Sequence, residues 1–503
     1  MVLAQGTQNA TDKKVNVYPV KQSPKCSNEY TVNHALSTAS SDASKTTMTV
    51  SDAILLALRY NPNVQSAEIQ RVSDKYALRV AHNEFEWQYT LTGQAAYNTS
   101  RNTSSFAPDD TRSTSTKSTE LSALARIKTG LGTEYSVTSR NPTTNGNYNP
   151  TLEFNIVQPL LRGFGPAVAK APLYNAADQA IIDKLSLRST LINTVSSVVN
   201  SYLKIIQEQY NVHTAQLAVD SYKKTIDLDN ALIEAGRKSP TDVIQAKADL
   251  ASEKVRLQNT KNQVINDHLT FLNLLGLPDN TPFNIPSDTP PIKKSPYSVE
   301  EAYNIALKNN ISYQVALLNL KILKRNLIVA KDNSRMALDL RANATTGGNA
   351  GTAYNTGLDN LYNNKNSSVN VELNLDIPIN NYSLKQAVVN AQVALDKATI
   401  SLVQQKRELR TTIVNDITNL NYQLEQIDLA KNALELQQKS QRILEEKLKF
   451  GLVSIFEITS RQRDLDLARD TLINSKISYW NSLIQFYADI GTTLDFWHIS
   501  VRY

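Results

Sequence analysis

Two acidic side chains, Asp242 and Glu457, occupy matching places in two similar stretches of the chain that lie far apart in the sequence. The stretches read "GRKSPTDVIQAKADL" (residues 236–250) and "GLVSIFEITSRQRDL" (residues 451–465). A carboxylate can act as a general acid or base, but only with a reacting group in reach. The sequence has no metal-binding motif, phosphate loop or nucleophile elbow. The five histidines are scattered: His34, His82, His213, His268 and His498. We therefore expect no enzyme activity, no metal site and no cofactor.

Both acids stand where a helix is expected to begin. A glycine just past a helix end supplies the left-handed conformation that closes the helix. A serine followed three residues later by an acid forms a capping box at the start of the next helix. Both stretches contain this series: Gly236, Ser239 and Asp242 in one, and Gly451, Ser454 and Glu457 in the other. Capping alone would account for both acids.

The chain consists of two halves built on one plan. At a constant offset, "VSDAILLALRYNP" (residues 50–62) is similar to "VEEAYNIALKNNI" (residues 299–311), and the acid-containing stretches follow in the same order. A repeated order of this kind indicates tandem structural repeats. We divide the chain into a polar N-terminal extension (1–47), a first repeat (48–280), a proline-rich linker (281–296), a second repeat (297–492) and a C-terminal tail (493–503).

Each repeat contains a section in which apolar and polar residues alternate, as in "VNVELNLDI" (residues 369–377). A period of two predicts strands with one apolar face. We expect strands at about 85–97, 119–129, 133–139 and 151–157 in the first repeat, and at about 337–345 and 367–376 in the second. The polar segments Asn98–Lys117 and Thr345–Ser368 are expected to be long exposed loops. Alternation by itself favours an ordinary soluble sheet over a sheet that faces lipid.

A pair of long helices follows the strands in each repeat, at 167–276 and at 381–491, and each pair turns back at a tip that contains one of the acids. Between residues 413 and 450 the apolar residues form two stripes, Ile413, Ile417, Leu420, Leu424 and Ile427, and Tyr422, Leu429, Leu436 and Ile443. A helix in a two-stranded coiled coil needs only one such stripe. Two stripes with polar residues between them predict a wall of helices with both faces exposed to water.

The composition of the 503 residues excludes several classes of protein. The net charge is only +6 and no block of Lys and Arg stands out, so a nucleic-acid partner is not expected. No run of 18 apolar residues is present, so no membrane-spanning helix is expected. The single cysteine, Cys26, excludes an internal disulfide.

The ordered set of motifs resembles the TolC-like outer membrane efflux proteins. The set comprises the paired openings "TVSDAILLALRYNP" and "SVEEAYNIALKNN", the bends "QPLLRGFG" and "DIPINN", and the two tips. The resemblance implies an α+β membrane protein, a homotrimer with one shared transmembrane β-barrel and a long antiparallel α-helical barrel. It also implies a passive exit duct, located in the outer membrane and extending through the periplasm, for a tripartite efflux pump or a type I secretion system. The implied partners are outer-membrane lipid, a periplasmic adaptor and an inner-membrane pump.

The resemblance also assigns roles to particular residues. Asp242 and Glu457 become candidates for rings that constrict the pore, although Ser460 replaces a second acid that the family can carry. The candidates for docking the adaptor are Gly236, Arg237, Lys238 and Ser239, and Gly451, Leu452, Val453 and Ser454. Trp87, Tyr89 and Leu91 are candidates for the membrane belt, with local core packing as the alternative. Pro159, Arg162, Gly163, Gly165 and Pro378 are expected to form strand-to-helix turns.

One departure and one alternative remain open at this stage. The family's usual plan has two strands per repeat, whereas the first repeat here offers four, which suggests an extra hairpin. A soluble coiled-coil scaffold or periplasmic adaptor without a pore would explain the helices. It would not explain why alternating strands occur at matching points of both repeats.

Overall fold

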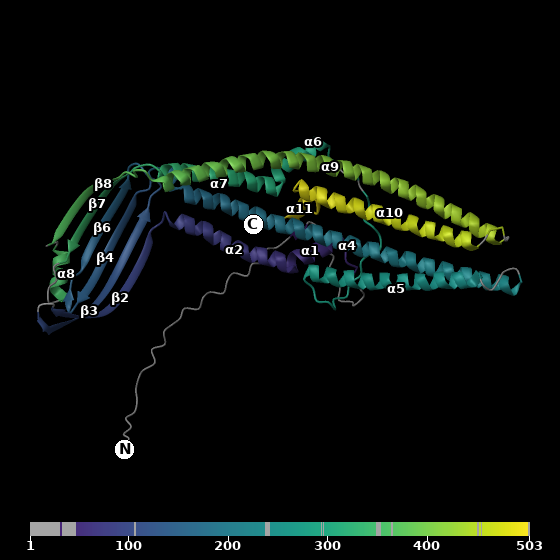
Figure 1. The fold of residues 1–503 in the computed structure, drawn as a ribbon, viewed down its shortest axis with the longest axis horizontal. Coiled ribbons are helices and arrows are strands. Elements are labelled where there is room, and N and C mark those ends of the chain that lie inside the picture. Colours follow the sequence, from purple (N-terminus) through teal and green to yellow (C-terminus); the bar gives the residue numbers. More distant parts are fainter. Residues whose placement is uncertain are drawn as a thin grey trace, which may run out of the picture.

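The computed structural model describes residues 31–32, 47–104, 107–236, 242–292, 294, 296–348, 354–363, 366–449, 452–453 and 455–500. The molecule is elongated (Figure 1). A sheet forms one end, and long helices run away from it to two tips at the other end. Among the described residues, no helix combines the length and the apolar character needed to cross a membrane.

The first half begins with two helices and continues into strands. Its elements are α1 (Val50–Tyr60), α2 (Pro62–Asn83), β2 (Gln88–Ser104), β3 (Ala107–Lys128), β4 (Glu134–Thr144), β5 (Asn147–Tyr148), β6 (Thr151–Pro159), α3 (Pro166–Ala169), α4 (Ala171–Glu234) and α5 (Asp242–Leu275). The last two form the first pair of long helices, and α5 lies beside the part of α4 nearer the tip (Figure 1).

The second half follows the same order with fewer strands. Its elements are α6 (Val299–Asn309), α7 (Ile311–Asn333), β7 (Ala337–Gly347), α8 (Tyr354–Tyr362), β8 (Ser367–Asp376), α9 (Tyr382–Lys449), α10 (Ile455–Asp489), α11 (Thr493–Phe496) and β9 (Ile499–Ser500). The short strand β9 pairs with β1 (Thr31–Val32), so this early segment lies beside the last strand of the described chain.

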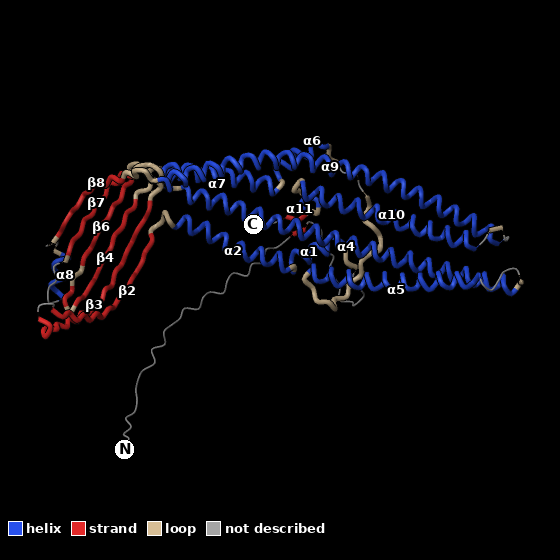
Figure 2. Tube along the Cα trace, in the orientation of Figure 1, coloured by secondary structure: helices blue, strands red, loops and turns tan. Residues whose placement is uncertain are grey.

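The main strands form one antiparallel sheet in the order β2-β3-β4-β6-β7-β8 (Figure 2). Pairing of β6 with β7 joins the two halves. The register aligns side chains of one kind across the sheet. One row is largely apolar: Tyr89, Ala125, Val137, Phe154, Ala344 and Val369. The next row, on the opposite face, is polar: Gln88, Arg126, Ser136, Asn155, Asn343 and Asn370. One face is therefore apolar and the other polar, because neighbouring residues in a strand point to opposite faces.

Two corners of the fold are built alike, one in each half. Asn61 caps α2 and donates from its side-chain amide to the Leu274 carbonyl at 2.7 Å, and Asn310 caps α7 and donates to the Asp489 carbonyl at 2.9 Å. Beside each contact, a glycine with positive φ ends the long helix pair, at Gly276 and at Gly491. These asparagines fix the short helices against the ends of the long ones.

The hydrophobic core is thin and lies where the short helices cross the long ones. Its largest fully buried side chains include Phe271, Phe486, Tyr479, Leu203 and Ile413. Farther along the first helix pair, apolar contacts occur in small groups. The structure thus spreads a modest apolar content over a long shape.

Three expectations about local structure were wrong. The segment expected to be a loop at 98–117 is occupied instead by the ends of β2 and β3, because backbone pairing continues through residues that are polar on both faces. Helix α8 lies within the second expected loop, 345–368. The helix expected from residue 167 breaks at Lys170, because Pro172 has no N–H with which to continue α3.

Candidate functional site at the helical tips

The two tips lie together at the end of the molecule farthest from the sheet (Figure 1). At the first tip Gly236 has φ +65, the left-handed conformation expected of a helix-closing glycine, and its N–H donates to the Ile233 carbonyl at 2.9 Å. At the second tip the Leu452 N–H donates to the Lys447 carbonyl at 3.1 Å, the long closing bond of a Schellman motif. At each tip, a backbone hydrogen bond therefore closes the last turn of the long helix.

Several candidate docking residues lie outside the described residues: Arg237, Lys238, Ser239, Gly451 and Ser454. The side chain of Leu452 is 72% exposed, and Val453 is half-buried. A single exposed leucine is common on protein surfaces, so the docking role of Leu452 and Val453 stays a prediction.

The two acids begin the returning helices. Asp242 is the first residue of α5 in the structure, and its side chain lies outside the description. Glu457 is the third residue of α10 and is exposed. Ser460, one turn farther along α10, is exposed as well. The acids thus share one end of the molecule, and their roles as caps or as pore-lining groups stay predictions.

The two helix pairs differ inside their tips. Between α4 and α5 the tip interior is apolar, with Ile226, Val243 and Ala246 buried together. Gln441 of α9, which matches Ile226 in the repeat, is 4% exposed, and Gln462 of α10 is 7% exposed. Amide groups therefore occupy the interior of the second tip. Polar groups hold a helix pair together less firmly than aliphatic ones, because any group left without a partner costs free energy.

A buried carboxylate continues this polar interior. Asp466 is 5% exposed and accepts hydrogen bonds from Gln462 and from Arg469, both at 3.0 Å. Burial raises the pKa of Asp466, while these two donors oppose the rise because they favour the charged form. Because Arg469 belongs to the same helix, the Asp466–Arg469 pair orders one face of α10. It does not connect α10 to the first helix pair.

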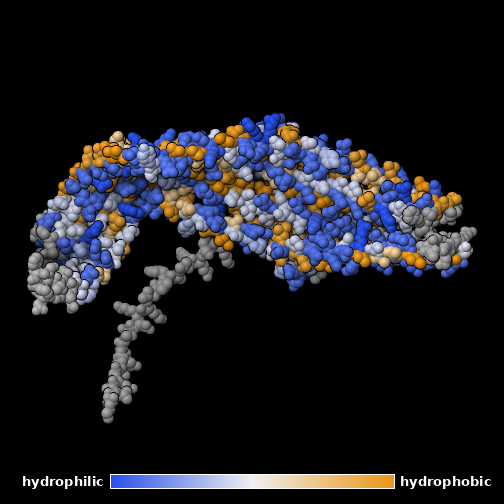
Figure 3. All heavy atoms as spheres, viewed as in Figure 1, coloured by the Kyte–Doolittle hydropathy of each residue, from blue (hydrophilic) through white to orange (hydrophobic). Residues whose placement is uncertain are grey.

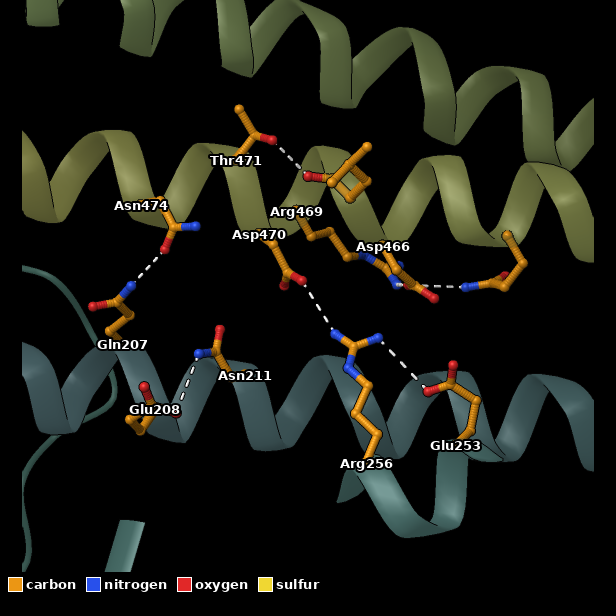
Figure 4. A network of polar contacts seen from close by, with 12 residues as sticks. Gln207, Glu208, Asn211, Glu253, Arg256, Asp466, Arg469, Asp470, Thr471 and Asn474 are labelled. Atoms are coloured by element: carbon orange, nitrogen blue, oxygen red, sulfur yellow. Dashed lines mark hydrogen bonds and ion pairs between the residues drawn. The ribbon is translucent and has the colours of Figure 1, made fainter. Parts of the chain in front are cut away.

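Polar side chains also cross the seam between α10 and the first helix pair. Arg256 of α5 donates to the Asp470 carboxylate of α10 at 3.1 Å and pairs with Glu253 at 3.6 Å (Figure 4). Burial raises the pKa of Asp470, and the Arg256 charge acts in the opposite direction. Nearer the sheet, Gln207 of α4 donates to Asn474 of α10 at 2.5 Å (Figure 4).

A second arginine makes the link closest to the tips. Arg463 of α10 donates from Nε to the hydroxyl of Tyr222 on α4 at 3.2 Å, and its guanidinium lies 3.2 Å from the carboxylate of Asp249 on α5. Burial raises the pKa of Tyr222, and the hydrogen bond from Arg463 opposes the rise. Sequence reasoning missed Arg256, Arg463 and their partners. The only available signal was that charged residues interrupt the apolar stripes of α5 and α10.

The belt and turn candidates lie at the sheet. Trp87, Tyr89 and Leu91 are 47%, 78% and 72% exposed, so they are not part of the core. Of the expected turn residues, Pro159 is buried, and Gly163 and Gly165 have φ +85 and +96. Arg162 lies 3.8 Å from Asp376, and Pro378 is the second residue after β8. Sequence reasoning missed the buried Asp332, which accepts a hydrogen bond from the Gly163 N–H at 2.6 Å. Within the described residues, no group of three or more His, Cys, Asp or Glu could hold a metal ion.

Solved structures share this fold. VceC from Vibrio cholerae aligns with a TM-score of 0.66 at 15% identity, over 88% of this chain and 96% of that one. The CmeC outer membrane channel of Campylobacter jejuni aligns with a TM-score of 0.64 at 14% identity, over 94% of both chains. At such identities the likeness shows the fold alone.

Sequence comparison places the chain among efflux proteins. The probable efflux pump outer membrane protein TtgC and the antibiotic efflux pump outer membrane protein ArpC, both from Pseudomonas putida, are 22% identical to this chain over 310 residues. The match covers 60% of this chain and 61% of each relative, so it spans less than two thirds of their length. A model of the family described as "Outer membrane efflux protein" matches residues 53–277 and 302–492, which is more than half of the chain. The chain therefore belongs to the outer membrane efflux protein family.

Proposed function

We propose that this chain is one subunit of a homotrimeric outer-membrane channel that extends into the periplasm and acts as a passive exit duct for a tripartite efflux pump or a type I secretion system. The sheet carries the proposal. It has an apolar face, and β2 and β8 form its two outer edges in the described chain. An unpaired edge is unfavourable in lipid. Three copies, each joining its β2 to the β8 of the next copy, would close one β-barrel.

The long helices are proposed to close a second barrel in the same way. On α9, Ile413, Leu420 and Ile427 are buried within the chain. The second stripe of α9 remains exposed by 55–66%: Tyr422, Leu429, Leu436 and Ile443. At the opposite side of the chain α2 also has an exposed apolar stripe: Ile69, Val72, Tyr76 and Val80. Exposed apolar stripes on both sides of the chain suit a subunit that packs against a neighbouring copy on each side.

The finer features of the fold belong to the same proposal. The equivalent contacts of Asn61 and Asn310 support a chain built from two tandem repeats, and the two separate family matches agree with this. The first repeat contributes four long strands and the second contributes two, so a trimer would contain three such sets.

At the tips we propose the docking site for a periplasmic adaptor and an inner-membrane pump that supplies the energy. Leu452, which is 72% exposed, and the half-buried Val453 lie at this surface. In a trimer Asp242 and Glu457 would each form a ring of three carboxylates, which favours cations. The polar seam between α10 and the first helix pair, which includes Arg256 and Arg463, can separate with little exposure of apolar surface. We therefore propose that the two helix pairs move apart at this seam when the tips open.

The relatives are named for efflux of antibiotics and of toluene, and we propose a comparable small-molecule cargo for this chain. The soluble scaffold is disfavoured, because it would leave the apolar sheet face in water. Conductance of purified protein in a planar bilayer tests the duct. We expect a trimer that requires detergent and conducts, weakly with closed tips and more strongly when Asp242 and Glu457 are both changed to Ala. A trimer that never conducts, even with both changes, would overturn the proposal.

A further inference from the structure

Large apolar side chains are exposed wherever the chain connects to the helix-side end of the sheet. The five connections there each contribute one, exposed by 40–86%: Trp87 before β2, Leu131 between β3 and β4, Leu160 after β6, Met336 before β7 and Ile379 after β8. A single exposed leucine needs no explanation, but a set that encircles one end of a sheet indicates a covered surface.

The row along β8 shows where this surface ends. Alternate residues from Val369 to Ile379 are all apolar and are 53–86% exposed: Val369, Val371, Leu373, Leu375, Ile377 and Ile379. Figure 3 shows hydrophobic side chains gathered over the sheet at β8 and toward the neighbouring start of α9. The ten residues of β8, at about 3.3 Å each and tilted by about 40°, give a height of roughly 25 Å, which is the height of the apolar band of an outer-membrane barrel. The residues just after Ile379 therefore lie at the level of lipid head groups.

A tyrosine and a lysine occupy that level. Tyr382, the first residue of α9, is 70% exposed. The Nζ atom of Lys385 lies 5.0 Å from the centre of the Tyr382 ring, and the Lys385 side chain is exposed. Asn381 holds the start of this helix, because its Oδ1 accepts a hydrogen bond from the Leu384 N–H at 3.2 Å. The two side chains thus stand on a fixed backbone.

The charged residues around Lys385 leave its ammonium group available to bind an anion. It makes no ion pair with any described residue, whereas the nearest acid in the sequence, Asp376, lies 3.8 Å from Arg162. A lysine ammonium held over an aromatic ring matches a phosphate oxygen in charge and in hydrogen bonding.

We propose that Tyr382 and Lys385 bind the phosphate of an anionic phospholipid at the periplasmic edge of the outer membrane. This inference rests on the proposed membrane placement. The occupant is a lipid and not a free phosphate, because the site directly continues the apolar row that ends at Ile379. The aromatic ring positions the ammonium, and the acyl chains lie along the row.

Native mass spectrometry of the full-length trimer tests this inference. Wild type and Lys385→Gln are each mixed in detergent with equal amounts of phosphatidylglycerol and phosphatidylethanolamine. We expect the variant to retain about five-fold less phosphatidylglycerol, in keeping with about 1 kcal/mol per lysine at an anionic surface. Lys397→Gln is the matched control, since Lys397 is also exposed on α9 but lies about 18 Å farther from the sheet.

Further variants and a competitor separate the outcomes. Tyr382→Phe keeps the ring and should retain most of the lipid, and Tyr382→Ala should not. Equal retention by wild type and Lys385→Gln would overturn the inference, and so would full displacement of the lipid by inorganic phosphate. Conductance distinguishes failure of the lipid inference from failure of the proposed channel function. A trimer that conducts without lipid preference contradicts only this inference, whereas a protein that never conducts contradicts the proposed function.

Discussion

Arg463 on α10 donates a hydrogen bond from Nε to the hydroxyl of Tyr222 on α4 at 3.2 Å. Because its guanidinium also reaches Asp249 on α5, one side chain ties the second helix pair to both helices of the first. The matching position in the first repeat is Ala248, so the first pair has no counterpart of this arginine. The link is therefore a feature of the seam and not of the duplicated plan.

Removing this link should favour separation of the helix pairs. The Arg463 side chain is 60% exposed, so each link contributes only about 0.5 kcal/mol. Three links in a trimer would total about 1.5 kcal/mol, roughly a tenfold change in an open-closed equilibrium. We expect Arg463→Gln to raise the open probability of single channels by up to that factor.

Arg461→Gln is the control for this prediction. Arg461 lies two residues away and pairs with Asp464 on the same helix at 3.1 Å. It should leave the open probability unchanged. If the two variants behave alike, the link to Tyr222 and Asp249 does not hold the tips together.

Two glycines with similar backbone angles should respond very differently to alanine. Gly236 and Gly276 have φ +65 and +73, so either substitution costs about 1–2 kcal/mol in backbone strain. A Cβ atom at Gly276 would lie 2.2 Å from the Tyr60 carbonyl oxygen, whereas one at Gly236 would meet nothing within 4 Å. We expect Gly236→Ala to fold with a slightly lower melting temperature and Gly276→Ala to be strongly destabilised. Equal melting temperatures would contradict this account of the corner.

Asp416 on α9 should make stability depend on pH. Burial, and next the neighbouring Asp489, raises the pKa of Asp416 from 3.8 to about 7, and the two carboxyl groups share a hydrogen bond. A raised folded-state pKa means that the stabilising effect is complete below the unfolded value near 4 and is lost as the pH rises through about 7. Between about pH 4 and pH 7 each pH unit should cost up to about 1.4 kcal/mol, and above pH 7 the loss levels off, because both states are then deprotonated.

Denaturant unfolding of wild type and Asp416→Asn at pH 5 and pH 8 measures this effect. The variant cannot lose its proton, so its stability should change less over this range. Asp428→Asn, an exposed carboxyl group on the same helix, should keep the wild-type pH dependence. A wild-type protein that is equally stable at both pH values would contradict the shared proton.

The sequence predicted those features that depend on local pattern. Alternation around Leu373 located β8, and Gly236 located a helix end, because period and backbone freedom are local properties. The loop expected from Asn98 onward was wrong, because the β2–β3 hairpin continues through polar residues as long as the backbones remain paired.

The seam could not be predicted, since it depends on how helices cross. Arg256 and Asp470 stand far apart in the sequence, and no local pattern indicates that they meet at 3.1 Å. Gln441 reads as part of a wet helix face, yet it is only 4% exposed, because the tip of α10 covers it. Such contacts follow from tertiary packing.

The last prediction separates the two roles of Glu457. If Glu457 only caps α10, Glu457→Gln should lower stability by up to about 1 kcal/mol and leave ion selectivity unchanged. If three copies form a ring, the same change should move the reversal potential in a potassium chloride gradient toward zero, because the pore loses negative charge. Ser460→Glu restores an acid one turn farther along the exposed face and, in the Glu457→Gln background, should recover cation preference. A reversal potential that none of these variants shifts, in channels that conduct normally, leaves capping as the role of Glu457.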